Sequence, residues 1–254
     1  IAAGEWEPPA LVALSEVENR KVLEDLIYGT GISRYDYGII HEDSPDPRGI
    51  DVCLIYRKDL TKVIKYRYLK PQGMAPDEFR TRTVLYAECR FSDDTVYLLV
   101  NHWPSRRGGV LAGEDMRRKI GEMVKATVDS VSSRAGTRSK IVILGDFNCT
   151  PEDNVAALLT GRYASGIKMV NISATELQGN GTYRYQGTWE MIDQVIVSEC
   201  LIRENARFRI FQPDFLLRYD GKYPGPAPFS TFSGYRYKGG FSDHLPVLID
   251  ISIR

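Results

Sequence analysis

The stretch IVILGDFN, residues 141–148, places two polar side chains directly behind four consecutive aliphatic residues. Such a run is typical of a strand that is buried on both faces, and Gly145 permits a tight backbone exit from it. Asp146 and Asn148 then emerge at the carboxyl end of the strand, where a central sheet positions groups that converge on a ligand. A β-turn with Asp and Asn as ordinary turn formers is the competing interpretation, and the stretch alone does not separate the two.

The composition describes a chain that can bury a core and that carries no net charge. Its 254 residues are 43% hydrophobic, and 33 Lys and Arg balance 33 Asp and Glu. We expect a single domain, because this length is within the range of one large domain. The charge balance excludes a global positive field that recruits nucleic acid or an anionic membrane, so any polyanion has to be held locally.

The sequence shows no signal for a membrane span or for targeting. No apolar run approaches the roughly 20 residues of a membrane span, and the first residues lack the pattern of a signal peptide. We expect a soluble protein, either cytoplasmic or exported with a leader removed. The four cysteines are widely spaced without a zinc pattern, which favours buried free thiols. No protein partner is indicated, and we expect a monomer.

Short runs of β-branched and aliphatic residues recur along the chain and predict strands. The predicted strands are residues 11–14, 52–56, 83–89, 96–100, 141–144, 192–197, 208–211 and 247–253. Helical spacing predicts helices over residues 17–27 and 114–131, and a third helix that begins at residues 150–152. Many strands with few helices predict two packed sheets flanked by helices. Segment 212–240, rich in Gly, Pro, Tyr and Phe, is too long for a plain connection, and we expect it to be ordered.

Polar residues stand at the ends of several predicted strands. Asp193 falls on the strand face shared with Val195 and Val197, where a carboxylate needs a partner such as a histidine. Of the three histidines, His102 follows one predicted strand and His244 precedes another. A single histidine at a strand end is more often structural. Two of them, beside acids in equivalent positions, favour a functional site.

The remaining polar candidates lie nearer the start of the chain. The first predicted strand runs into Glu16, and Glu18 opens the following helix, where the helix dipole favours an acid. Glu16 has no such structural reason for its position. His41 lies in the polar loop HEDSPDPRG, residues 41–49, and we interpret it as a surface residue.

Five short motifs resemble, in order and in approximate spacing, the endonuclease/exonuclease/phosphatase superfamily, and they span most of the chain. They are SEV at Glu16, NHWPS at His102, GDFN at Asp146 and Asn148, IDQVIV at Asp193, and SDHLPV at Asp243 and His244. The fold that the resemblance implies is an α/β (α+β) four-layer sandwich, in which two packed and mainly antiparallel β-sheets are flanked by helices. This agrees with the predicted elements.

The resemblance also implies hydrolysis of phosphoester bonds by water, with Mg²⁺ or Mn²⁺ as the cofactor. The metal ligands implied by the matching positions are Glu16, Asp243 and Asp146. This set is chemically sensible, because Mg²⁺ prefers oxygen ligands and needs only one or two carboxylates beside substrate and water.

The same resemblance implies roles for the other matching residues. Asp146 and Asn148 position the attacking water and the phosphoryl group, Asp193 orients His244, and His102 contacts a phosphate oxygen. A histidine held by a buried Asp has a fixed tautomer and a raised pKa, which suits proton transfer or phosphate stabilisation. Two further residues complete the implied set: Asp51, which we expect to steady His102, and Arg82, which resembles the family's phosphate-contacting arginine.

One part of the family pattern is missing from the sequence. Family members begin with a strand that carries an Asn of the metal network, upstream of the Glu motif. Only fifteen residues precede Glu16, and none supplies this strand. We expect one domain over residues 1–254 that lacks the family's first strand, with trimming upstream as the favoured reason.

The sequence leaves the substrate open. Aromatic and Arg side chains near the predicted site can stack on bases, sugars or inositol rings, and ordinary loop packing explains each of them equally well. These candidate substrate contacts are Arg106, Tyr185, Trp189, Tyr235 and Arg236. A nuclease or phosphodiesterase, with nucleic acid among its candidate substrates, is the first hypothesis. A phosphatase of an inositol, lipid or other soluble phosphate is the second, and a catalytically silent binding module on the same fold is the third.

Overall fold

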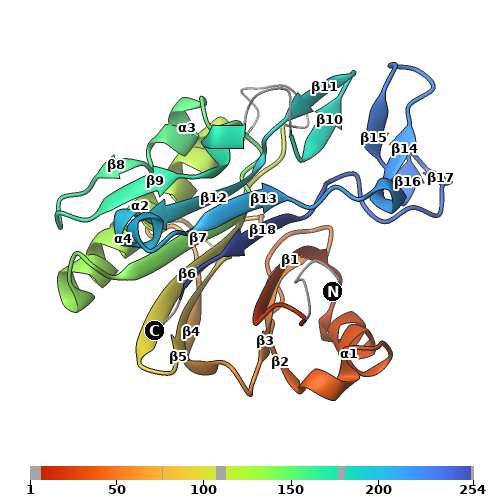
Figure 1. Ribbon diagram of the computed structural model, residues 1–254. Helices are drawn as coiled ribbons and strands as arrows, with labels where there is room; N and C mark the ends of the chain where they lie inside the picture. Colours follow the sequence, from red (N-terminus) through yellow and green to blue (C-terminus); the bar gives the residue numbers. More distant parts are fainter. Residues whose placement is uncertain (1–6, 76, 107–112, 177–180, 253–254) are drawn as a thin grey trace.

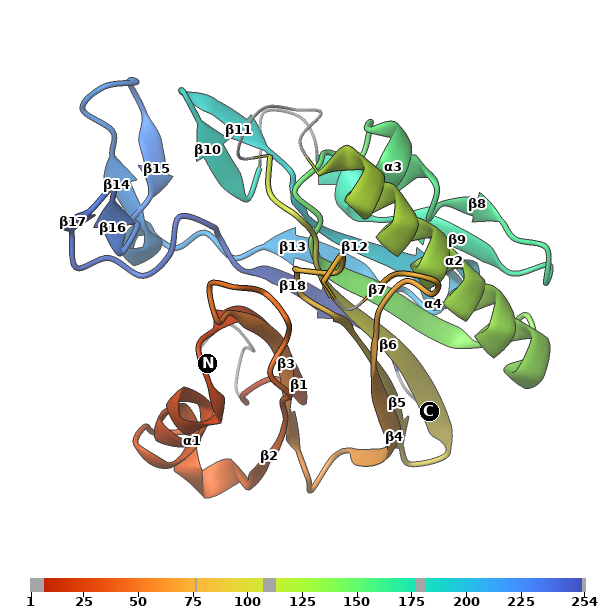
Figure 2. The ribbon, with the colours of Figure 1, turned by 180° about the vertical axis from the view of Figure 1, so that it is seen from behind.

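The computed structural model describes residues 7–75, 77–106, 113–176 and 181–252. Two β-sheets pack against each other, and helices lie on their outer sides, as Figure 1 and the reverse view in Figure 2 show. The predicted fold class, a mixed α/β sandwich with large sheets and few helices, is confirmed. Among the described helices, none combines the length and the apolar character needed to cross a membrane.

The larger sheet contains seven strands in the order β4-β5-β6-β7-β12-β9-β8. Their bounds are β4 Lys62–Leu69, β5 Val84–Phe91, β6 Asp94–His102, β7 Lys140–Asp146, β8 Gly161–Arg162, β9 Lys168–Asn171 and β12 Asp193–Ser198. Every neighbouring pair is antiparallel except β6 and β7, which run parallel. A parallel pair needs a long crossover, and the helix α2, Glu114–Ala135, lies between these two strands in the chain.

The second layer of strands is smaller. It contains a three-stranded antiparallel sheet in the order β1-β3-β2 and the antiparallel pair β13 and β18. The bounds are β1 Leu11–Val17, β2 Tyr37–Ile40, β3 Asp51–Arg57, β13 Arg207–Ile210 and β18 Val247–Asp250. The helix α1, Arg20–Tyr28, lies against the three-stranded sheet, and the short helices are α3 Asn154–Ala157 and α4 Glu199–Arg203.

Three apolar clusters hold these layers together. In β7, Ile141 and Ile143 belong to the cluster under α2, whereas Val142 belongs to the cluster between the two sheets. The third cluster lies between α1 and the three-stranded sheet. Because successive residues of a strand face opposite sides, the aliphatic run that precedes Asp146 is buried on both faces, as the sequence predicts. All four cysteines are free thiols, and three of them are buried.

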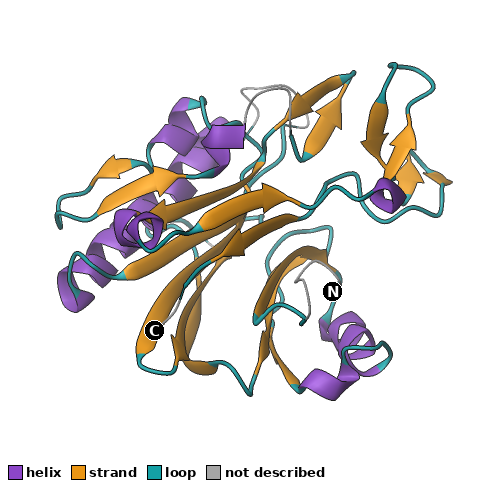
Figure 3. Cartoon of the chain, viewed as in Figure 1, coloured by secondary structure: helices purple, strands orange, loops and turns teal. Residues whose placement is uncertain are grey.

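Segment 212–240 is ordered, as expected, and it forms two small hairpins (Figure 3). These are β14 Leu217–Tyr219 with β15 Pro226–Pro228, and β16 Phe232–Ser233 with β17 Arg236–Tyr237. A third hairpin, β10 Tyr183–Tyr185 with β11 Thr188–Glu190, lies near them and contacts β15. These hairpins stand at one end of the sandwich (Figure 1).

Two predicted helix starts are too early. Val17 is the last residue of β1, and α1 begins only after Asn19, whose side-chain oxygen accepts a hydrogen bond from the backbone N–H of Val22 at 3.1 Å. The third helix does not begin at Thr150: a turn comes first, in which the Asp153 N–H donates to the Thr150 carbonyl at 3.1 Å, and α3 starts at Asn154.

Gly145 is the residue that allows β7 to lie beside β6 at this point. Its φ is +130°, and a Cβ built on it would lie 1.9 Å from the carbonyl oxygen of Asn101 on β6. We therefore predict that Gly145→Ala lowers the free energy of unfolding by about 3 kcal/mol or more, because the strands must separate or the backbone must change its conformation. Urea denaturation followed by circular dichroism measures this change.

Gly73→Ala is the matched control for Gly145→Ala. Gly73 also has a positive φ, +75°, but nothing lies within 4 Å of a Cβ at this position. Only the backbone penalty of about 1 kcal/mol is expected. Equal losses for the two variants would contradict the role given to the close approach of β6 and β7.

Candidate active site

Strand register aligns three of the predicted site residues in one row. His102 and Asp146 are register partners in the parallel pair β6 and β7, and Asp146 and Asp193 are register partners in the antiparallel pair β7 and β12. β6 and β7 both end here, and β12 begins here. The row therefore lies across the ends of three central strands of the large sheet, with Asp146 in the middle.

Asp146 is buried, and Asn148 fixes the orientation of its carboxylate. The Asn148 N–H donates to Oδ1 at 2.8 Å, and the side-chain amide donates to Oδ2 at 3.0 Å. Nε2 of His102 lies 3.4 Å from the same Oδ2. Burial and the nearby charge of Asp193 raise the pKa of Asp146 to about 7. Asn148 has a φ of +49°, which Asn tolerates better than most residues.

His244 is the partner that the buried position of Asp193 requires. Nδ1 of His244 lies 2.7 Å from Oδ2 of Asp193, across 51 residues of sequence. Burial lowers the pKa of His244, but the charges of Asp193 and Asp146 outweigh burial and raise this pKa to about 10. The ring of Tyr183 lies 5.0 Å from the His244 ring, centroid to centroid. The imidazole is thus held on one side by a carboxylate and on another by an aromatic ring.

His102 has a different environment from His244. Its side chain is buried, and burial together with the charges of Arg82 and Arg48 lowers its pKa to about 2. It is therefore neutral at pH 7. Among the described residues, nothing accepts or donates a hydrogen bond at its buried Nδ1.

The expected contact between Asp51 and His102 is wrong, and so is the surface position of His41. Oδ2 of Asp51 lies 2.9 Å from Nε2 of His41, and Oδ1 accepts a hydrogen bond from the Ser44 N–H at 2.7 Å. The His41 side chain is only 4% exposed. The reason is the antiparallel pairing of β2 with β3, which brings the end of β2 close to the start of β3.

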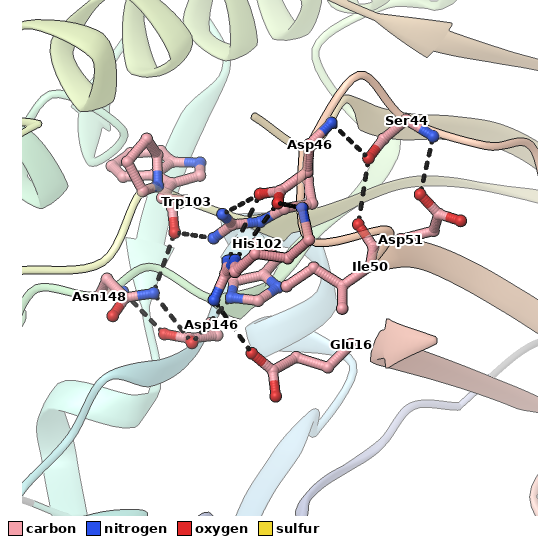
Figure 4. A network of polar contacts seen from close by, with 12 residues as sticks. Glu16, Ser44, Asp46, Ile50, Asp51, His102, Trp103, Asp146 and Asn148 are labelled. Atoms are coloured by element: carbon pink, nitrogen blue, oxygen red, sulfur yellow. Dashed lines mark hydrogen bonds and ion pairs between the residues drawn. The ribbon is translucent and has the colours of Figure 1, made fainter. Parts of the chain in front are cut away.

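A network of charged and polar groups, exposed at Glu16 and buried at Asp46 and Arg82, connects Glu16 with Asp146 (Figure 4). Oε1 of Glu16 lies 3.9 Å from Nη1 of Arg48, and Nε of Arg48 donates to Asp46 at 3.2 Å. The other Asp46 oxygen accepts from Nη1 of Arg82 at 2.8 Å. Arg82 also donates to the Trp103 carbonyl, which accepts a second hydrogen bond from the Asn148 side chain at 2.9 Å. Asp46 and Arg48 are not among the residues predicted from the sequence, because there they look like ordinary residues of a polar loop.

Glu16 combines an exposed carboxylate with a strained backbone. Its φ is +58°, and it lies where the register of β1 against β3 shifts, between Leu14 and Val17. A non-glycine residue in this conformation is unfavourable and needs support from the surrounding structure. The Glu16 side chain is 60% exposed, so its carboxylate is accessible to a ligand.

The two carboxylates of the row, Asp146 and Asp193, fit a hard divalent cation. Ligand atoms of Asp146, Asp193 and His244 all lie within 4.8 Å of one another, but His244 is protonated at pH 7 and leaves the carboxylates as the cation ligands of this group. Burial of two neighbouring carboxylates is unfavourable, as the raised pKa of Asp146 indicates, and a cation would relieve their repulsion. Glu16 and the exposed Asp243, the other predicted metal ligands, lie outside this group. A second group contains His41 and Asp43, on the loop after β2, and Asp51, the first residue of β3.

The predicted substrate contacts do not all face solvent. Arg106 is bound internally: Nε donates to the Asn148 carbonyl at 2.8 Å, and its Nη atoms lie 3.1 Å from Asp153 and 3.5 Å from Glu190. Arg106 links the segment after β7 to β11. Its guanidinium contacts protein groups here, instead of facing solvent as the predicted substrate contact requires. Arg82 is buried in the network described above.

The four other candidate contacts lie on two hairpins. Tyr185 is 54% exposed on β10, and Trp189 is half-buried on β11. Tyr235 is fully exposed in the turn between β16 and β17, and Arg236 is exposed on β17. The hairpins carry these side chains on the outside of the sandwich.

Comparisons with known proteins identify the family and the fold of the chain. The sequence profile of the Endonuclease/Exonuclease/phosphatase family matches residues 1–253. No curated protein sequence matches the chain at a significant level.

Several solved structures are similar in fold. D. rerio TDP2, complexed with a single-strand DNA product, has a TM-score of 0.58 at 13% identity, covering 96% of this chain and 86% of that one. The human nocturnin catalytic domain with bound sulfate has a TM-score of 0.61 at 16% identity, covering 96% and 82%. A mannosyl-6-phosphatase of Bacteroides thetaiotaomicron has a TM-score of 0.62 at 14% identity, covering 96% and 85%.

The ion pair between Asp46 and Arg82 is buried, and this makes a stability prediction possible. Their side chains are 4% and 3% exposed. We predict that Asp46→Asn lowers the free energy of unfolding at pH 7 by about 3 kcal/mol, because it leaves the Arg82 charge buried and uncompensated. Asp25→Asn is the control: the Asp25 side chain is 63% exposed and pairs with Lys21, so a loss below about 0.5 kcal/mol is expected.

The same pair gives a pH dependence of stability. Burial raises the pKa of Asp46, but hydrogen bonds from Arg48 and Arg82 outweigh burial and hold this pKa below its usual value. The stability difference between the wild type and Asp46→Asn is therefore fully present above the unfolded pKa of about 3.9, and it shrinks as the pH falls below that value. Urea denaturation between pH 7 and pH 3 measures the difference. A difference that stays constant over this range would contradict the prediction.

Proposed function

Because the chain belongs to the endonuclease/exonuclease/phosphatase family, and is thus a hydrolase of phosphate esters, we propose that it is a nuclease or phosphodiesterase that cleaves phosphodiester bonds with water. The observation that carries the proposal is the convergence of Asp146, Asp193 and His244 at the ends of the central strands β7 and β12. A fold shared with a TDP2 bound to single-strand DNA product supports a nucleic acid strand as a candidate substrate.

His244 and Asp193 act as a pair in this proposal. Because Asp193 accepts a hydrogen bond from Nδ1–H, the other ring nitrogen of His244 is left for the substrate. The positive charge on His244 stabilises the negative charge that develops on the phosphoryl oxygens. Asp193 holds the ring in position and does not itself contact the substrate.

Asp146, Asn148 and His102 position the reacting groups. The two hydrogen bonds from Asn148 fix the Asp146 carboxylate, so this carboxylate can orient an attacking water molecule. His102 is neutral and lies next to Asp146, where it can donate a hydrogen bond to a phosphoryl oxygen.

Family membership makes the enzyme dependent on a divalent metal, and we propose Mg²⁺ or Mn²⁺ as the ion. Asp146 belongs to the convergent group and is also a predicted ligand, whereas Glu16 and Asp243 remain predicted ligands outside this group. When bound, such an ion activates water and neutralises phosphoryl charge.

Parallel hydrolysis assays test the proposed function. The purified protein is incubated with Mg²⁺ or Mn²⁺ and with bis(p-nitrophenyl) phosphate, p-nitrophenyl phosphate, single-stranded DNA, duplex DNA or an inositol phosphate. We expect cleavage of the diesters, loss of activity in EDTA and recovery when the metal is added back. Cleavage of monoesters alone would instead identify a phosphatase, and no cleavage of any substrate would favour the silent binding module.

His244→Ala is predicted to lower kcat for the diester by about 10²-fold or more, because the charge facing the phosphoryl group is lost. Asp146→Ala is expected to have an effect at least as large. Circular dichroism spectra and unfolding midpoints close to those of the wild type would show that the loss is chemical.

His41→Ala is the matched control for His244→Ala, because it breaks a buried pair of a histidine with an aspartate away from the proposed site. His41 lies outside the group of Asp146, Asp193 and His244. We expect lower stability but unchanged kcat per folded molecule. Similar kcat losses in the His41 and His244 variants would speak against the assigned role of His244.

A further inference from the structure

A pocket lined by three arginines lies beside the charged network of Figure 4. Its volume is about 380 Å³, and its walls include Arg48, Arg80, Arg82, Thr81 and Ser105. Arg48 and Arg82 belong to the network that leads to Glu16 and Asp146, whereas Arg80 and Thr81 have no part in it. The pocket therefore adjoins the proposed active site and extends beyond it.

The charges of the pocket favour an anion. Two acids, Asp46 and Glu78, also line it, so the three arginines leave one positive charge in excess. Asp46 is already shared between Arg48 and Arg82. Within the described part of the chain, Arg80 has neither a hydrogen bond nor an ion pair, and it is exposed to solvent. Its guanidinium is free to bind a ligand.

Two buried donors of the pocket are unsatisfied, and this is the observation that points to a ligand. Thr81 is 6% exposed and Arg82 is 3% exposed. Thr81 Oγ1 and Arg82 Nε have no hydrogen-bond partner among the described residues. Leaving buried polar groups unpaired is unfavourable, so such groups are usually satisfied by a ligand or by water. A phosphate has several acceptor oxygens and can satisfy both donors while it pairs with Arg80.

The position of the pocket relates this anion to the substrate. Arg82 donates to the Trp103 carbonyl, which also accepts from Asn148, the residue that holds Asp146. We propose that the pocket binds a second phosphate of the substrate, one that is not cleaved, so that the preferred substrates carry at least two phosphate groups. The inference rests on the proposed phosphodiesterase function and narrows its substrate class. Arg80, Thr81 and Nε of Arg82 are the recognising groups.

Binding to the metal-free protein tests the pocket separately from catalysis. Isothermal titration calorimetry in EDTA compares thymidine 3′,5′-bisphosphate with thymidine 5′-monophosphate. We expect the bisphosphate to bind at least tenfold more tightly, and Arg80→Gln to remove most of this preference. Arg90→Gln is the control, because Arg90 is an exposed arginine near the far end of β5. Equal affinity for the two nucleotides, or an equal effect of both substitutions, would overturn the inference.

Thr81→Val separates a binding role from a structural one. The substitution keeps the shape of the side chain and removes a hydroxyl that has no partner, so the unfolding midpoint should stay equal or rise. Binding of the bisphosphate should nevertheless weaken several-fold. Unchanged binding in this variant would remove Thr81 from the site and would contradict the proposed contact.

Hydrolysis of two matched esters links the pocket to turnover. The p-nitrophenyl esters of thymidine 5′-phosphate, with and without a 3′-phosphate, share the scissile bond and differ by one phosphate. We expect kcat/KM to favour the doubly phosphorylated ester about tenfold in the wild type and in Arg90→Gln, and a much smaller ratio in Arg80→Gln. Bisphosphate binding without hydrolysis of either ester would refute the proposed function and leave the pocket standing. Hydrolysis with a ratio of one would refute the pocket.

Inositol bisphosphate provides a second arm of the binding experiment. A nucleic acid strand and a free sugar phosphate both present two phosphates, and the pocket recognises this shared chemistry. Tighter binding of the nucleoside bisphosphate assigns the second phosphate to a nucleic acid strand, whereas tighter binding of the inositol compound assigns it to a small molecule. Both results require Arg80, and binding of either compound that is indifferent to Arg80→Gln would contradict the inference.

Discussion

The parallel register of β6 and β7 is the constraint on which the candidate site depends. It brings His102 next to Asp146, and the antiparallel register of β12 then brings Asp193 to the other side. The close approach requires a residue without a side chain at Gly145, where a Cβ would meet the backbone of the neighbouring strand. A shift by one residue would turn each of these side chains to the opposite face of the sheet. The backbone thus sets the geometry of the site before any side chain interacts.

Most of the buried strands could be predicted from the sequence, and most of the exposed ones could not. The buried strand β2, Tyr37–Ile40, is an exception, since it is not among the strands predicted from the sequence. The aliphatic run of β7 is recognisable because both of its faces contact an apolar cluster. β4, Lys62–Leu69, was missed because it alternates charged and aromatic residues and is largely exposed. The short hairpins of segment 212–240 were also missed, since pairs of two or three residues leave no periodic pattern. Two helix starts were misplaced because β1 extends to Val17 before α1 and a turn precedes α3.

Parts of the site could be predicted because burial leaves a recognisable pattern. A carboxylate at Asp193, on an apolar strand face, requires a partner, and His244 is that partner. The contacts of Asp46 could not be foreseen, since an Asp in a loop has the same appearance whether it binds water or a buried arginine. His41 was misplaced for the same reason. No local pattern shows that a polar loop folds back over the start of β3.

The distance along the chain between the paired residues of the site has a consequence for how the enzyme matures. Asp193 and His244 are separated by 51 residues, and β6 reaches β7 only through the α2 crossover. Chains with such non-local contacts lose the entropy of closing large loops before the stabilising contacts form, and they therefore fold slowly. A fragment or a partly folded intermediate would hold the acids without the imidazole that balances them. Enzymatic competence should therefore appear late during refolding, together with the last cooperative step.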